Sequence, residues 1–504
     1  MENLPKIIDE TQWPLEIKIH DPLRDHTFQG RIVLPAVETM QLLAHATKSR
    51  VPDIHTSLIQ DIRFTKFLFM DADTKTVDAV HEVRVFDDGT VRSRLLTTFK
   101  SKKNSITRPQ EHAQLLWTRN PETTPLPPYD SLLGLEGIGL EVPAQKIYQD
   151  LVPFGPAYQN ITSPLLMTGE GGLCSVSGGI DTLPAGPLGS PFPLDASFHA
   201  ASVWGQHFMG LLTFPVAIKK RLILQPTVFG KTYLCKTIFI KKESDSLFFD
   251  IWILGPDGNI CEGALGVQMK KVAPLDSQPQ PPMPQEGKKD LEWIRKKCRD
   301  LALIELKTIE ESAKRILSPD ERERLQDMTR ERGASYLAAR LALKRLSRRM
   351  SGNDTTTPAD TIVTVTPDKQ PRCPLTNGEE GPYCSLSHDK RFAVAVVSDN
   401  KIGIDVEEIS DRVLKPRRFY MNEKETLLAK NSSLNEVEAF LRVWSIKEAA
   451  SKATGLKLAT VWSKTSVTEI GREKSVVEID GTLWEVFHEK VDNHLFTILT
   501  LQNP

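Results

Sequence analysis

Two stretches within the first 272 residues carry the same pattern of apolar and polar positions. In each stretch an apolar helical run opens at a proline, Pro35 in the first and Pro193 in the second, and alternating segments typical of strands follow. Each series of strands contains a turn that ends in Asp-Gly, at residues 87–89 and 256–258. Asp-Gly between alternating segments is a strong hairpin signal. One helix followed by a strand-rich meander, twice over, predicts a duplicated α+β unit.

The pattern changes after residues 273–288, which hold five prolines and little apolar surface to bury. Such a segment predicts an extended linker. A weaker break at residues 119–128 divides the first 272 residues near their middle. Beyond the linker we expect a second α+β domain, with helices in 300–350 and 422–453 and strands at 361–366, 391–398, 401–406, 475–479 and 494–501.

Composition and charge exclude several classes of protein. The chain has 504 residues, too many for one hydrophobic core. Lys plus Arg (64) nearly equals Asp plus Glu (65), so we expect no nucleic-acid partner. The six cysteines form no C-x-x-C pair, which argues against a zinc site or a disulfide framework. Without a signal-peptide pattern or a long apolar run, we expect a cytoplasmic protein with no membrane span.

A strand-like segment at residues 401–407 places two carboxylates side by side. Asp405 and Glu407 share one face of the strand, while apolar side chains take the other. A hard divalent cation such as Mg²⁺ would relieve their repulsion, because it prefers carboxylate oxygens. The alternative is an exposed acidic pair on an edge strand.

The segment at residues 444–452 predicts a helix with Trp444, Glu448 and Lys452 on one face, because these residues lie four positions apart. The alternative is a buried tryptophan beside an ordinary Glu–Lys pair. By composition the pattern W-x-x-[KR]-[DE]-x-x-x-[KR] should occur only about 0.02 times in this chain. Its place downstream of the strand at residues 401–407 makes a chance match hard to sustain.

Together these segments resemble the signature of 4′-phosphopantetheinyl transferases of the monomeric, double-sized Sfp type. The resemblance covers residues 298–504 and includes the strand at 403–407, the segment 417–423 and the helix at 444–452. Such enzymes move phosphopantetheine from coenzyme A to a serine of a carrier protein and release 3′,5′-ADP.

The resemblance implies a role for each matching residue. Three carboxylates, Asp405, Glu407 and Glu448, would hold Mg²⁺ on the coenzyme A pyrophosphate. Glu423 lies where the family has a candidate base, with Glu425 as a neighbouring alternative. The remaining contacts to coenzyme A would come from Lys452 at the transferring phosphate, from His388 and Arg340 at the 3′-phosphate, and from Lys369 and Arg372 beside the proline of the family's phosphate-binding turn.

A basic run on the predicted helix before this signature has two interpretations. It consists of Lys344, Arg345, Arg348 and Arg349. It is either a solvated helix face or a surface that meets an acidic carrier protein.

The two halves of the first 272 residues also carry candidate chemistry. The first has His26, Gly30 and Pro35 in the pattern HxxxGxxxxP, expected about 0.04 times by chance. The second has Asp195 and His199 four residues apart near a helix start. The alternatives are a structural histidine and an aspartate that stabilises a helix N-terminus.

These two motifs, with residues 154–159 (FGPAYQ) between them, resemble the double-hot-dog dehydratase domains of polyketide and related fatty-acid synthases. The resemblance covers residues 10–272. It implies that His26 is the base at the α-carbon of a 3-hydroxyacyl thioester and that Asp195 is the acid at the departing hydroxyl. His199 would orient Asp195, and the backbone N–H of Gly30 would stabilise the enolate-like oxygen.

We therefore predict an α+β protein with two activities, in the order of the last two domains of enediyne-type iterative polyketide synthases. A double hot-dog of two helix-wrapped antiparallel sheets would precede a pseudo-twofold α+β transferase domain. The expected parts are a first hot-dog (1–118), an inter-hot-dog linker (119–145), a second hot-dog (146–272), a proline-rich linker (273–290) and the transferase (291–504).

The expected partners are coenzyme A and an acyl carrier protein, and a homodimer through the dehydratase is compatible with the resemblance. Two alternatives keep the transferase but change the role of residues 1–272. One makes them a non-catalytic module that docks the carrier protein, and the other makes them a hot-dog thioesterase.

Overall fold

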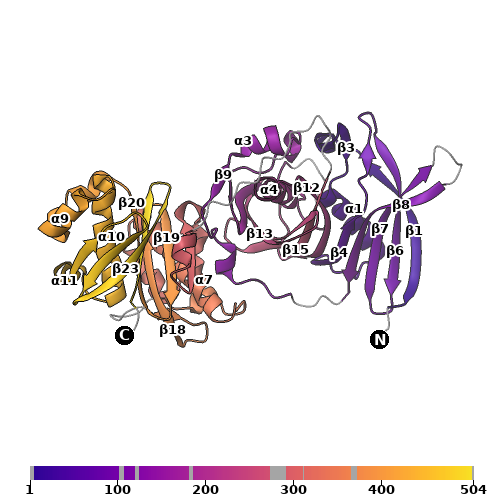
Figure 1. The fold of residues 1–504 in the computed structure, drawn as a ribbon. Helices are drawn as coiled ribbons and strands as arrows, with labels where there is room; N and C mark the ends of the chain where they lie inside the picture. Colours follow the sequence, from indigo (N-terminus) through magenta and orange to yellow (C-terminus); the bar gives the residue numbers. More distant parts are fainter. Residues whose placement is uncertain are drawn as a thin grey trace. The chain divides into compact units, whose positions relative to one another are not determined.

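The computed structural model describes residues 5–100, 107–119, 124–180, 186–272, 291–309, 311–364 and 372–501. They form two compact units, each of which is drawn in Figure 1. The first unit comprises residues 1–124 and 139–287, and the second comprises residues 125–138 and 288–504. The predicted linker at residues 273–290 lies outside the described residues. No helix in the described ranges is long and apolar enough to cross a bilayer.

Each half of the first unit packs strands around one long helix, α1 (Ala36–Arg50) in the first half and α4 (Phe192–Met209) in the second. α1 begins directly after Pro35, and Pro193 lies in the first turn of α4, where its missing N–H costs no hydrogen bond. The other elements of the first half are β1 (Ile7–Lys18), β2 (Thr27–Phe28), β3 (Arg31–Val33), β4 (Leu58–Phe64), β5 (Phe69–Met70), β6 (Thr76–Phe86), β7 (Thr90–Lys100) and β8 (Thr107–Thr118). Those of the second half are β9 (Leu140–Val142), α3 (Ala144–Lys146), β10 (Leu165–Thr168), β11 (Gly171–Ser177), β12 (Thr213–Ile223), β13 (Thr232–Glu243), β14 (Ser246–Leu254) and β15 (Ile260–Lys271).

The two halves share one antiparallel sheet. Among the described residues it has twelve strands in the order β1-β6-β7-β8-β4-β12-β15-β14-β13-β11-β10-β9, and a smaller sheet has the order β2-β3-β5. The halves join where β4 pairs with β12, with Ile59 opposite Arg221. The hairpins predicted at residues 87–89 and 256–258 connect β6 to β7 and β14 to β15. The prediction of two helix-wrapped antiparallel sheets is confirmed, and the edges of these sheets are joined.

The second unit contains two helix-on-sheet layers, as a pseudo-twofold domain requires. α7 (Arg330–Met350) packs on β16 (Asp300–Glu305) and β19 (Phe392–Ser398), and α10 (Glu436–Thr454) packs on β20 (Lys401–Glu408) and β24 (His494–Leu501). The other strands are β17 (Arg372–Pro374), β18 (Glu380–His388), β21 (Thr465–Glu469), β22 (Lys474–Ile479) and β23 (Thr482–Val491). The other helices are α2 (Tyr129–Leu132), α5 (Glu292–Arg295), α6 (Pro319–Gln326), α8 (Arg417–Tyr420), α9 (Glu423–Lys430) and α11 (Leu458–Lys464). In the described residues the strand orders are β16-β19-β18-β17 and β20-β24-β23-β22-β21.

Three predicted elements of the second unit are wrong. Residues 300–305 form strand β16 and not a helix, because five of its six residues are buried and such a run carries no clear period. Residues 361–364 form no strand, since Thr361 ends a short helical turn that begins at Ala359, and residues 365–366 of the predicted strand lie outside the described residues. The helix expected over residues 422–453 is divided into α9 and α10, because the Asn435 side chain accepts from the N–H of Glu438 and starts a new helix.

Residues 125–138 lie within the predicted linker at 119–145, yet they belong to the second unit. Leu133 and Ile138 are buried in its cores. The Gly137 N–H donates to the Leu303 carbonyl at 2.9 Å, and Glu136 forms an antiparallel bridge with Ile304. A segment that separates the two halves of the first unit in sequence is therefore part of the fold of the second. We call it the docked segment.

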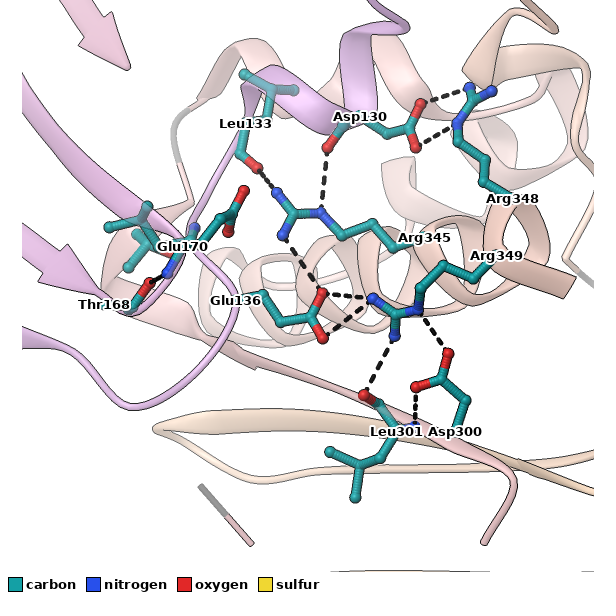
Figure 2. A network of polar contacts seen from close by, with 12 residues as sticks. Asp130, Leu133, Glu136, Thr168, Glu170, Asp300, Leu301, Arg345, Arg348 and Arg349 are labelled. Atoms are coloured by element: carbon teal, nitrogen blue, oxygen red, sulfur yellow. Dashed lines mark hydrogen bonds and ion pairs between the residues drawn. The ribbon is translucent and has the colours of Figure 1, made fainter. Parts of the chain in front are cut away.

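Arginines of α7 hold the docked segment (Figure 2). Arg348 donates to both carboxylate oxygens of Asp130 at 2.6 and 2.7 Å, and both residues are buried. Arg345 donates to the Leu133 carbonyl at 2.8 Å, and Arg349 donates to Glu136 at 2.9 Å. The basic run is therefore neither a solvated helix face nor a surface for a carrier protein.

Replacing Asp130 should destabilise the second unit. Asp130→Ala leaves the buried Arg348 guanidinium without its carboxylate, so the free energy of unfolding should fall by about 3–5 kcal/mol. Denaturant unfolding of the full chain, followed by tryptophan fluorescence, measures this change. The control is Asp399→Ala, which removes an exposed ion pair to Arg299 and should cost less than about 1 kcal/mol. Equal effects of the two substitutions would contradict the docked segment's place in the fold.

Candidate functional site

The candidate metal ligand Asp405 is buried on β20 and held from two sides. Its Oδ1 accepts from the Ser387 hydroxyl and from the Lys452 ammonium, each at 3.0 Å. Its Oδ2 accepts from the Ser445 hydroxyl at 2.8 Å. Ser387 comes from β18, and Ser445 and Lys452 come from α10, so three donors fix the orientation of this carboxylate. The motif analysis missed the role of Ser445, although it directly follows Trp444 in the recognised segment.

Negative charge is concentrated around Asp405. Burial and the neighbouring charge of Asp405 raise the pKa of Glu407 to about 7, and the same two causes raise the pKa of Glu448. The Trp444 indole N–H donates to Glu407 Oε1 at 3.0 Å. Lys452 offsets only part of this charge, because the pKa values of both glutamates remain raised beside it.

The three carboxylates fit Mg²⁺ by their donor chemistry, since hard cations take oxygen ligands and would relieve the repulsion that raises these pKa values. In the part of the chain that the structure describes, no three acidic, histidine or cysteine side chains lie close enough together to hold a metal ion. Binding would therefore require side-chain movement, and the ligand assignment remains a prediction.

An open cleft of about 850 Å³ reaches Glu407, the one member of the three carboxylates among its described lining residues. Its lining includes His388, Glu407 and Trp444. Burial lowers the pKa of His388, and so do the charges of Lys452 and Arg340. The cationic side chains that line the cleft are Lys307, Arg332, Lys390 and Arg412. The lining holds as many carboxylates, Glu331, Asp389, Glu407 and Glu408, so the cleft carries charges of both signs. Its lysines and arginines offer contacts of the kind that bind a phosphorylated ligand.

Two other predicted coenzyme A contacts lie in a second cavity of about 210 Å³, which Arg340 and Arg372 both line. Arg340 donates to the Thr364 carbonyl at 2.9 Å, and Arg372 stacks on the ring of Tyr383 at 3.4 Å. The structure thus groups Arg340 with Arg372 and groups His388 with Glu407. Lys369 lies outside the described residues.

The two candidate bases at the start of α9 differ sharply in environment. Glu425 is buried, completes a capping box with Asn422 and accepts from Lys447 Nζ at 2.8 Å. Glu423 is exposed. The Glu425 carboxylate is therefore engaged in hydrogen bonds that stabilise the start of α9. Of the two glutamates, only Glu423 is accessible to a substrate. The spacing Asn422-x-x-Glu425 is a capping-box signal that the sequence analysis missed.

In the first unit, His26, Asp195 and His199 line one cavity of about 100 Å³, although they come from different halves. His26 Nδ1 lies 2.8 Å from the Val33 carbonyl oxygen. A carbonyl can only accept, so Nδ1 carries the proton and the other ring nitrogen, Nε2, has a free lone pair in the neutral form. The structure thus brings the predicted base and acid to a common space.

Aromatic packing sets the electrostatics of this site. The ring of Phe154 stacks on His26 at 4.3 Å and lies 4.9 Å from His199. Burial lowers the pKa of His26, and the charge of Asp195 opposes this shift only in part. His199 Nε2 lies 3.2 Å from Asp195 Oδ2, and the Tyr148 hydroxyl lies 3.4 Å from His199 Nδ1. His199 is therefore in position to orient Asp195.

Gly30 occupies a different place from the one that its predicted role requires. With Gln29 it forms the turn between β2 and β3, and both residues have positive φ angles of 55° and 72°. Such a turn favours glycine. Gly30 is exposed, and it is not among the described residues that line the cavity.

Comparison with known proteins gives matches in the region that holds the C-terminal motifs. The family model of the 4′-phosphopantetheinyl transferase superfamily matches residues 401–498. The 4′-phosphopantetheinyl transferase gsp of Aneurinibacillus migulanus is 32% identical over 74 residues, which are 14% of this chain and 31% of that protein. The 4′-phosphopantetheinyl transferase psf-1 of Bacillus pumilus is 38% identical over 75 residues, 14% of this chain and 32% of that protein. The match spans about a third of the length of these curated relatives.

Similar solved structures include polyketide synthase dehydratase domains. The dehydratase domain of a mycocerosic acid synthase-like polyketide synthase is 18% identical, with a TM-score of 0.43, and the match covers 53% of this chain and 94% of that one. The dehydratase domain from the CurH module of curacin polyketide synthase is 17% identical, with a TM-score of 0.40, and covers 52% and 92%. Residues 401–498 are therefore similar to the 4′-phosphopantetheinyl transferase superfamily, in the region where the C-terminal motifs lie.

Proposed function

We propose that this chain is a bifunctional cytoplasmic enzyme whose two units act on one acyl carrier protein. The second unit transfers 4′-phosphopantetheine from coenzyme A to a carrier serine, and the first dehydrates 3-hydroxyacyl thioesters that the carrier then bears. The observation that carries the proposal is that the charge of buried Asp405 raises the pKa values of Glu407 and Glu448, and that Glu407 lines a cleft which also holds four cationic side chains. The family match over residues 401–498 supports the transferase.

In the proposed transfer, the carrier serine oxygen attacks the β-phosphorus of coenzyme A. The new P–O bond forms as the bond to 3′,5′-ADP breaks, and Glu423 accepts the serine proton. Asp405, Glu407 and Glu448 would hold Mg²⁺, which when bound neutralises charge on the pyrophosphate. Lys452 now donates to Ser387, the Ile404 carbonyl and Asp405, and it would exchange one of these bonds for the transferring phosphate. Trp444 keeps Glu407 oriented through its indole hydrogen bond.

In the proposed dehydration, His26 and Asp195 act on adjacent carbons. The free Nε2 of His26 removes the α-proton, and the electron pair forms the double bond while the bond from the β-carbon to the hydroxyl oxygen breaks. Asp195 donates a proton to that hydroxyl, so the leaving group is water. His199 positions Asp195. The observation behind this half is that residues from two separate halves line one cavity.

Loss of a metal ligand should abolish priming. Asp405→Asn and Glu448→Gln each remove a charge that the pyrophosphate complex needs, so transfer from coenzyme A to a carrier protein should fall by about a hundredfold or more. Mass spectrometry of the carrier measures the transfer. Glu469→Gln, the same change at an exposed residue of β21, should leave it unaltered. Wild-type transfer by Glu448→Gln would refute the ligand assignment.

The acid–base pair should behave as one unit. His26→Ala and Asp195→Asn should each lower dehydration of a 3-hydroxyacyl carrier by about 10²–10⁴-fold, and the double variant should lose little more. Chromatography of the released acyl groups measures the products. No dehydration by the wild type would favour a docking module, and release of the free acid would favour a thioesterase.

The pH profile of dehydration should reflect the burial of His26. Burial lowers its pKa from the ordinary 6.5, so the neutral base persists to lower pH and the rate should begin to fall only below pH 6.5. Phe154→Ala exposes the imidazole to water and should move this acid limb to higher pH. Initial rates across the pH range, for wild type and variant, measure the limb. An acid limb at or above pH 6.5 in the wild type would contradict the effect of burial.

A further inference from the structure

The cavity of the first unit follows the axis of α4 away from the acid–base pair. Asp195, His199 and Ser202 all line it, and spacings of four and three residues place them on one face of the helix. Asp195 lies in the first turn, and Ser202 lies about 10 Å further along at 1.5 Å per residue. The cavity therefore has a reacting end at Asp195 and a distal end near Ser202.

Two hydroxyl groups at the distal end have no partner among the described residues. Ser202 is 3% exposed and Thr213 is 0% exposed, and neither hydroxyl makes a hydrogen bond to the protein. Both residues line the cavity. A buried hydroxyl without a partner costs about 1–3 kcal/mol, so native proteins rarely leave one.

Comparable hydroxyls nearby are satisfied within the protein. Ser197 of α4 donates to the Pro193 carbonyl at 2.7 Å, and Thr39 of α1 donates to the Pro35 carbonyl at 2.9 Å. Both use the carbonyl four residues earlier, which is the usual outlet for a hydroxyl in a helix. Ser202 has such a carbonyl within its own helix, yet its hydroxyl does not use it.

Thr213, which follows α4 in the chain, lies beside the C-terminal part of that helix. A methyl group built on Gly205, three residues after Ser202, would lie 3.6 Å from Thr213 Oγ1. Residues 205 and 202 share a face of α4, so Thr213 stands beside the turn that carries Ser202. The cavity lining is mostly apolar and includes Phe28, Phe198, Leu212, Phe214 and Met269.

We propose that the distal end of this cavity binds an oxygen-bearing group of the acyl chain, a ketone or hydroxyl several carbons from the thioester, and that Ser202 and Thr213 select for it. The inference rests on the proposed function of the first unit. A pure hydrocarbon chain would leave both hydroxyls buried without partners, whereas a carbonyl or hydroxyl oxygen would satisfy them. The cavity volume of about 100 Å³ is several times the roughly 10–15 Å³ that a single water needs, so the cavity has room for a group larger than one water.

Binding measurements on the full chain test the proposal. The probes are amide-linked 3-hydroxyacyl pantetheine analogues of increasing length, each made with and without a ketone at the penultimate carbon. At one chain length the ketone member should bind wild type about tenfold or more tightly than its hydrocarbon match, by calorimetry. Ser202→Ala combined with Thr213→Val should bring this ratio to about one without weakening the hydrocarbon member. Ser197→Ala, a buried hydroxyl of the same helix outside the cavity lining, should keep the wild-type ratio.

The outcomes separate this inference from the proposed dehydration. Equal affinity within every pair, no binding of any analogue, or a preference that survives in the double variant would overturn the inference. Dehydration of the hydrocarbon thioesters with equal affinities would leave the proposed function standing alone. Preferential binding without dehydration would support the distal site and count against the enzyme. If Thr213→Val does not fold, Ser202→Ala with Thr213→Ser should still reduce the ratio, and an unchanged ratio would overturn the inference.

Discussion

The buried pair of Asp130 and Arg348 is the constraint on which the second unit depends. Its partners lie 218 residues apart in sequence, and they fix the docked segment against α7. The same helix carries Lys344, which is buried and paired with Glu321, and Arg340, a candidate for binding coenzyme A. Glu321 in turn accepts from the N–H of Thr364, whose carbonyl holds Arg340. The Asp130–Arg348 pair thus helps to fix α7, and α7 carries Arg340 into the cavity of about 210 Å³. Neither Asp130 nor Arg348 lines that cavity.

The two candidate sites use burial for opposite purposes. In the first unit, burial beside Phe154 lowers the pKa of His26, which favours the neutral form that the proposed base needs. In the second, burial and the charge of Asp405 raise the pKa values of Glu407 and Glu448. In the proposed function the first site carries out proton transfer and the second carries out phosphate chemistry, so each pKa shift matches the chemistry proposed for its site.

Local signals in the sequence were sufficient for much of this structure. The helices after Pro35 and around Pro193, the Asp-Gly hairpins and the strand at residues 401–407 were predictable, because each depends on neighbours in sequence. The carboxylates on β20 and the face of α10 also follow from short spacings. The docked segment was not predictable, because its burial depends on arginines more than two hundred residues away. Gly30 is a second example. The HxxxGxxxxP motif identifies this glycine, but the motif does not show that the residue lies in an exposed turn.

The order of synthesis gives the docked segment a further consequence. Translation at about 5–20 residues per second separates Asp130 from Arg348 by roughly 10–40 s. During that interval the rest of the first unit emerges, but α7 does not yet exist, and the apolar side chain of Leu133 has no core to enter. The second unit can be completed only after α7 has been made and has captured a segment synthesised long before it. A chaperone or protease that meets the nascent chain therefore has a defined time window in which to act on this segment.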